Sequence, residues 1–204
     1  MTEPIHVVFN DYICAPAETV FKLCCPVEEY KWIPGWKCNL IHCPNDRVEE
    51  GTVFSEILSA PFLNDGFVGK TVWTAISHEP ENNQVVFRLV NRISSSIYKI
   101  GLAGDKLGNS TISLDLTYTP IGKTYSRRMS EEREKKIHAM LSILSLMLKH
   151  YSEKGFIIPA SSVQKAAMGS QELGYSDKLH LGFNYVAMLI AGDKNRSRFM
   201  IKKV

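Results

Sequence analysis

The sequence has no run of 18 apolar residues, which is the length that a transmembrane helix requires, so we expect no membrane span. It opens without the basic segment and apolar stretch of a secretory signal, which favours a cytoplasmic protein. It also lacks a CxxC pair, an HExxH motif and a phosphate-binding glycine loop. Covalent, metal and nucleotide chemistry leave such signatures, whereas a binding cavity leaves none, so these absences favour binding over catalysis.

Cysteines are few and odd in number, five in 204 residues, so no disulfide framework is expected and free thiols suit a reducing compartment. Cys38, His42 and Cys43 lie close together and suggest a metal site at first. Structural zinc sites, however, repeat close-spaced ligand pairs, and no second pair is present. Buried cysteines acting as small hydrophobic residues are the better interpretation. We therefore expect neither a metal nor another cofactor.

Excess charge is also small, at a formal +3, so we expect no nucleic-acid partner, because dedicated nucleic-acid binders concentrate basic charge on one face. The exception is the basic end of the chain, residues 194–203, where apolar residues separate the charges. One interpretation is a weak contact of this tail with a membrane surface or a protein partner. A segment packed on the domain, or a frayed end, is the interpretation we favour.

What the sequence does contain is a clear order of predicted elements. β-branched and aromatic residues predict a strand over 5–14, and Pro16 and Pro26 each begin a short helix before the turn at Pro34. Six more strands are predicted over 36–43, 52–58, 68–78, 84–93, 96–103 and 110–119. Short loops join neighbouring strands such as the last two, so these strands must be antiparallel.

After residue 125 the apolar period changes from two to that of a helix. Apolar residues at spacings of four, three, four and three predict one apolar face over Ser130–Tyr151, with Ser130 as the N-cap and Gly155 as the end. We place a domain over 1–155 and a C-terminal extension over 156–204. In the extension, 161–174 reads as a linker or a loose short helix, and 179–191 is apolar but too short to span a bilayer.

Two short motifs carry a resemblance to a known family. The segment Ala15–Phe21, followed by Glu29–Trp36, resembles the START-like superfamily, also called SRPBCC, and in particular its polyketide cyclase/dehydrase and lipid-transport branch. The resemblance covers about three quarters of the chain. It implies an α+β helix-grip fold, in which a curved antiparallel sheet of seven strands wraps around the long helix. The gap between sheet and helix then forms a cavity.

We expect this cavity to bind or transport an apolar small molecule, such as a lipid or a polyketide-like compound. The alternatives are a cyclase or dehydratase enzyme that uses polar residues in the same cavity, and a non-catalytic protein-interaction domain whose interior is filled. The expected ligand-binding wall consists of Trp36, Trp73, Phe87, Tyr98, Leu114, Leu116 and Tyr118 from the sheet side, and Leu141, Leu144 and Leu148 from the helix. For Phe87 a change of register by one residue would place its neighbours inside instead.

The enzyme alternative needs a polar residue in the cavity. Glu56, His78 and Arg88 are candidates, together with the hydroxyl groups of Tyr98 and Tyr118. For His78 an exposed loop position, and for Arg88 a solvated outer face, are the interpretations we favour. Because none of these residues stands out, we assign no catalytic residue.

Overall fold

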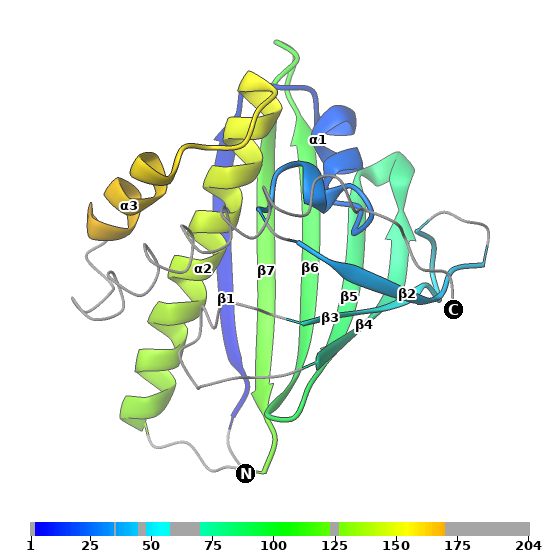
Figure 1. Cartoon of the computed structure of the whole chain (residues 1–204), viewed down its shortest axis with the longest axis vertical. Helices are drawn as coiled ribbons and strands as arrows, with labels where there is room; N and C mark the ends of the chain where they lie inside the picture. The colour runs from blue at the N-terminus through cyan, green and yellow to red at the C-terminus, as the bar shows by residue number, and fades with distance from the viewer. Residues whose placement is uncertain (1–2, 35, 45–47, 58–69, 123–126, 170–204) are drawn as a thin grey trace.

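The computed structural model describes residues 3–34, 36–44, 48–57, 70–122 and 127–169 (Figure 1). Its strands are β1 (Ile5–Ile13), β2 (Cys38–His42), β3 (Val53–Ile57), β4 (Lys70–Glu79), β5 (Gln84–Val90), β6 (Ser94–Gly104) and β7 (Ser110–Pro120). Its helices are α1 (Ala17–Leu23), α2 (Arg127–Lys154) and α3 (Ala160–Gly169), with short 3-10 turns η1 (Glu29–Lys31) and η2 (Pro80–Asn82).

All seven strands form a single antiparallel sheet in the order β1-β7-β6-β5-β4-β3-β2. Figure 1 shows β2 and β3 turned steeply away from the direction of β1 and β7, so the sheet is strongly bent. The long helix α2 lies on one side of it, along β1. The predicted α+β helix-grip architecture, with its seven strands and one long helix, is confirmed.

Local side-chain chemistry moves several element ends from their predicted positions. β5 ends at Val90 rather than 93, because the Asn91 carboxamide oxygen accepts hydrogen bonds from the backbone N–H groups of Ile93 and Ser94 and closes a turn there. The second predicted short helix is only the 3-10 turn η1. The indole N–H of Trp32, just after this turn, donates to the Leu23 carbonyl at 2.8 Å and ties the turn to α1.

The helix α2 begins at Arg127, so the prediction of Ser130 as its N-cap is wrong. The added residues form ion pairs four residues apart, Arg127 with Glu131 and Arg128 with Glu132, both at 2.9 Å. Such pairs support an exposed helix end. The other end is as predicted: Gly155 has a φ of 76° and its N–H donates to the Tyr151 carbonyl.

The helix α2 packs mainly on β1, and on β7 to a smaller extent. Asp11 of β1 accepts hydrogen bonds from Ser145 at 3.1 Å and from the Lys149 ammonium at 3.0 Å. Of the predicted apolar face, Ile137, Leu141 and Leu148 are fully buried, whereas Leu144 is half-buried. A second buried stripe, which the sequence interpretation missed, contains Ile143 and Met147.

Beyond Gly155 the chain continues to pack on the domain. The helix α3 contacts α2, and the side chains of Ile158 and Val163 belong to the buried core. The domain boundary at residue 155 stays a prediction. The apolar segment 179–191 and the basic tail 194–203 lie outside the described residues. Among the helices that the structure describes, none is both long and apolar enough to cross a membrane.

Candidate ligand-binding site

The concave face of the sheet carries a cluster of aromatic rings from four adjacent strands. Phe54 of β3 stacks on its cross-strand neighbour Trp73 of β4, with ring centroids 5.4 Å apart. Trp73 also meets Phe87 of β5 at 5.6 Å and Tyr98 of β6 at 6.2 Å, both edge to face. Offset and edge-to-face contacts of this kind are the favoured geometries of aromatic pairs.

The apolar face continues onto β7, whose inward residues alternate with outward polar ones. Leu114, Leu116 and Tyr118 are all buried, and Leu116 is the cross-strand partner of Tyr98. The Arg133 guanidinium of α2 lies over the Tyr118 ring, 5.4 Å from its centre. Burial lowers the pKa of Arg133 to about 10, which still leaves the side chain charged at neutral pH.

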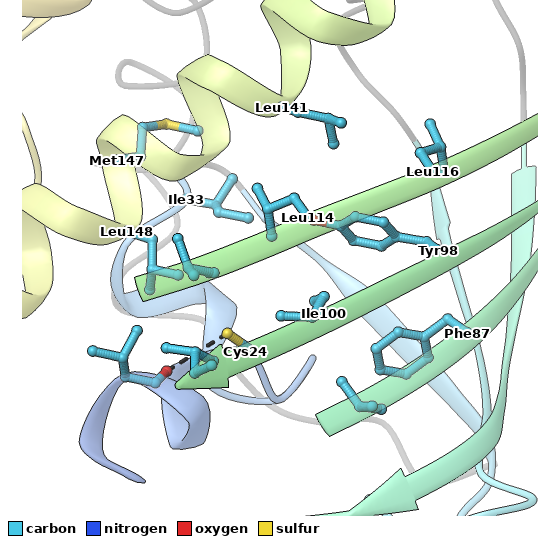
Figure 2. Packing of buried hydrophobic residues seen from close by; sticks show 14 of the residues in the cluster. Cys24, Ile33, Phe87, Tyr98, Ile100, Leu114, Leu116, Leu141, Met147 and Leu148 are labelled. Carbon is cyan, nitrogen blue, oxygen red and sulfur yellow. Dashed lines mark hydrogen bonds between the residues drawn. The ribbon is translucent and has the colours of Figure 1, made fainter. Parts of the chain in front are cut away.

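The helix and the sheet present their predicted residues to the same interior. Figure 2 shows Leu141 and Leu148 of α2 on the same side of the sheet as Leu114, Leu116 and Tyr98. Leu144 is half-buried and packs only partly against this core. All ten predicted wall residues belong to this core or pack against it, and whether they contact a ligand stays a prediction.

The facing of β5, which the sequence left open, follows from its burial pattern. Phe87 is 2% exposed, and its neighbour Arg88 is exposed on the opposite face. Arg88 therefore points away from the concave interior. Of the other candidates, the half-buried His78 stacks on Phe21 of α1 at 5.8 Å.

Trp36 is the outlier among the ten. It precedes β2 and is half-buried, and its indole N–H donates to the Pro26 carbonyl at 2.8 Å. This bond fixes the turn between η1 and β2. Trp36 packs against the core but is not part of the four-ring cluster around Trp73.

A polar cluster adjoins the aromatic rings. Glu56 of β3 is 3% exposed, and its cross-strand partner Thr71 of β4 is 1% exposed. Within the described part of the chain, neither carboxylate oxygen of Glu56, nor the Thr71 hydroxyl, nor the buried indole N–H of Trp73 makes a hydrogen bond. Burial raises the pKa of Glu56 to about 8, and the Trp73 indole N–H acts in the opposite direction.

A second carboxyl group, that of the half-buried Glu29 on η1, interacts electrostatically with Glu56. Burial and the charge of Glu56 raise the pKa of Glu29 well above its ordinary range. Glu29 also raises the pKa of Tyr98, after the larger effects of burial and Cys24. Burial, followed by Glu29 and Glu56, raises the pKa of Cys38 to about 12. Cys38 is the cross-strand neighbour of Glu56, which agrees with the effect of Glu56 on its thiol.

Sequence reasoning named Glu56 but gave it no preference, and it missed Glu29 and Thr71. Thr71 could be found only with the β3–β4 register, which places it opposite Glu56. Glu29 lies in a segment read as an ordinary short helix, so no local pattern marks it. No group of three potential metal ligands occurs in the described ranges, which include Cys38, His42 and Cys43.

Comparisons with known proteins agree on the fold. No protein-family model and no curated protein matches the sequence. Among solved structures, a START superfamily protein from Mycobacterium smegmatis matches with a TM-score of 0.53 and 13% identity, over 73% of this chain and 97% of that one. The Zhui aromatase/cyclase from Streptomyces matches with a TM-score of 0.51 and 12% sequence identity, over 75% of this chain and 98% of that one. CalU16 from Micromonospora echinospora matches with a TM-score of 0.52 and 14% sequence identity, over 92% of this chain and 89% of that one. The chain therefore has the helix-grip fold of the START-like superfamily.

Proposed function

We propose that the protein binds an apolar small molecule against the concave face of its sheet and carries it without changing it chemically. The observation that supports this most is the position of α2, which packs on β1 and β7 at one side of the sheet. The aromatic residues of β3 to β6 lie on the same face, on strands that α2 contacts little or not at all. A broad apolar surface with a few polar groups is typical of small-molecule sites.

The test is direct binding. Native mass spectrometry of the purified protein should detect a co-purifying small molecule. An environment-sensitive dye should gain fluorescence on binding, and fatty acids or polycyclic aromatic compounds should displace it. Saturable displacement by at least one of these classes is the expected result.

A matched pair of variants locates the site. Leu116→Trp adds bulk to the concave face, and we expect it to weaken dye binding at least tenfold. Thr117→Trp adds the same bulk to the opposite face of the same strand and should leave binding unchanged. Circular dichroism checks that both variants fold. Equal binding by both variants, or no saturable binding to the unmodified protein, would contradict the proposal.

The enzyme alternative is supported by one observation, the buried Glu56. A carboxyl group with a pKa of about 8 is mostly protonated at neutral pH and is suited to act as a general acid. The aromatase/cyclase that shares the fold is consistent with this alternative. Turnover of a polyketide-like substrate that disappears in Glu56→Gln would favour the enzyme. For the protein-interaction alternative, the described residues offer no specific support.

A further inference from the structure

Three neighbouring residues on the concave face hold four buried polar atoms with no hydrogen-bond partner among the described residues. They are both carboxylate oxygens of Glu56, the hydroxyl oxygen of Thr71 and the indole nitrogen of Trp73. Buried polar atoms of folded proteins nearly always have a partner, and leaving one without a partner destabilises the fold. Four such atoms in one place therefore point to a partner that the described residues do not supply.

The strand register makes these atoms converge. Glu56 lies opposite Thr71, and Phe54 lies opposite Trp73, in the same pair of antiparallel strands. Side chains two residues apart on a strand share a face, so Glu56, Thr71 and Trp73 all project from the face that carries the aromatic cluster. The Trp73 indole N–H lowers the pKa of Glu56, as a donor directed at a carboxyl group does, although the two side chains do not meet the geometry of a hydrogen bond.

The kinds of donor and acceptor select the chemistry of the missing partner. The Trp73 indole only donates, whereas the Thr71 hydroxyl and a protonated Glu56 carboxyl both donate and accept. A ligand hydroxyl group matches this set, because its oxygen accepts from Trp73 while its own O–H donates to Glu56. An ammonium group only donates, so it would leave the Trp73 N–H without a partner.

Charge argues in the same direction. Burial raises the pKa of Glu56 to about 8, so this carboxyl is mostly neutral at pH 7 and does not call for a cation. A ligand carboxylate or phosphate would be repelled by Glu56 or Glu29 whenever the respective carboxyl group ionises. A neutral polar group brings neither an uncompensated positive charge nor a negative charge that the glutamates would repel.

We propose that Glu56, Thr71 and Trp73 bind the hydroxyl group of a hydroxylated aromatic molecule, whose ring system packs against the surrounding aromatic side chains. The rings of Phe54 and Phe87, 6.0 Å apart and edge to face, adjoin the polar atoms and favour an aromatic body over a flexible chain. This inference rests on the proposed binding function and names its ligand class.

The experiment compares two ligands of nearly equal size, 2-naphthol and 2-methylnaphthalene, which differ by a hydroxyl in place of a methyl group. Their dissociation constants are measured by titration calorimetry at pH 7. We expect the unmodified protein to bind 2-naphthol about tenfold more tightly, the ratio that one or two net hydrogen bonds provide. Glu56→Leu removes the main partner, and the ratio should then fall to about one. Glu56→Gln keeps a donor and an acceptor and should retain most of the preference.

Thr71→Val is the second variant, because it has the same shape and cannot donate. It should reduce the ratio at least threefold and decides the question if Glu56→Leu fails to fold. A ratio of about one in the unmodified protein, or one that both variants leave unchanged, would overturn the hydroxyl site while leaving apolar binding intact. Tighter binding of 2-naphthylmethylamine than of 2-naphthol would overturn the hydroxyl class in favour of a cation. Failure of both neutral ligands to bind would overturn the hydroxylated aromatic class. The proposed function itself would fail only if fatty acids and polycyclic aromatic compounds also failed to displace the dye.

Discussion

Glu56 and Thr71 face each other across β3 and β4, and neither side chain makes a hydrogen bond within the described ranges although both are buried. An unsatisfied buried polar group typically costs about 1–3 kcal/mol of stability. The pair therefore destabilises the fold where it stands. Destabilising polar groups of this kind are common at sites that serve binding or catalysis rather than stability.

Stability should depend on pH through Glu56. Its pKa is about 8 in the folded state, against an ordinary 4.5, so the unfolded chain releases this proton first as the pH rises. The contribution of protonated Glu56 to the free energy of unfolding is fully present below pH 4.5. It is lost progressively between pH 4.5 and about pH 8, at roughly 1.4 kcal/mol per pH unit. Glu29, whose pKa is also raised, acts in the same direction.

Glu56→Gln should remove most of this dependence. Urea denaturation between pH 5 and pH 8.5 should show the free energy of unfolding of the unmodified protein falling by about 3 kcal/mol or more relative to the variant. The exposed Glu81→Gln is the matched control and should follow the unmodified protein. Parallel curves for the unmodified protein and Glu56→Gln would show that Glu56 is not the titrating group.

The helix α2 offers a graded test of the core. Leu141→Ala should lower the free energy of unfolding by about 2–5 kcal/mol, because Leu141 is completely buried and its removal leaves a cavity. Leu144→Ala on the same helix should cost clearly less, since Leu144 is half-buried. Chemical denaturation measures both, and equal losses would show that the two side chains are buried alike.

The accuracy of the sequence interpretation follows the range of the interactions. The apolar spacing of Ile137, Leu141 and Leu148 is local, and the structure confirms their burial. Ile143 and Met147 lie on another side of the same helix, which is also buried. The apolar spacing that predicts the first side gives no information about this second one. Burial on two sides depends on what the rest of the chain places against the helix.

The candidate site depended on register, which periodicity does not provide. A strand was predicted over 68–78 and lies at Lys70–Glu79, but the pairing of Glu56 with Thr71 requires knowing which residues lie opposite each other. A slip of one residue would turn both side chains to the other face. The sequence therefore predicted the sheet and apolar residues that prove to be mostly buried, but not the polar cluster beside them.

The polar contact between β1 and α2 should be measurable by a double-mutant cycle. Asp11 accepts hydrogen bonds from Lys149 at 3.0 Å and from Ser145 at 3.1 Å, and both members of the ion pair are partly exposed. We expect a coupling energy of about 0.5–1 kcal/mol between Asp11→Asn and Lys149→Met, reduced by added salt. The exposed pair of Glu18 and Lys22 on α1 is the control and should show weaker coupling. No coupling at low salt would mean that the pair does not contribute to docking of the helix.

Thiol reactivity reports on the surroundings of the polar cluster. Burial raises the pKa of Cys25 to about 11 and that of Cys38 to about 12, whereas Cys14 is exposed. Because the thiolate is the reactive form, iodoacetamide at pH 8 should label Cys14 first and Cys38 much more slowly, as peptide mass spectrometry would show. The charge of Glu56 contributes to the high pKa of Cys38, so Glu56→Gln should speed labelling of Cys38 above pH 8 and leave Cys14 unchanged. An unchanged Cys38 rate in this variant would place Glu56 too far away to act on the thiol.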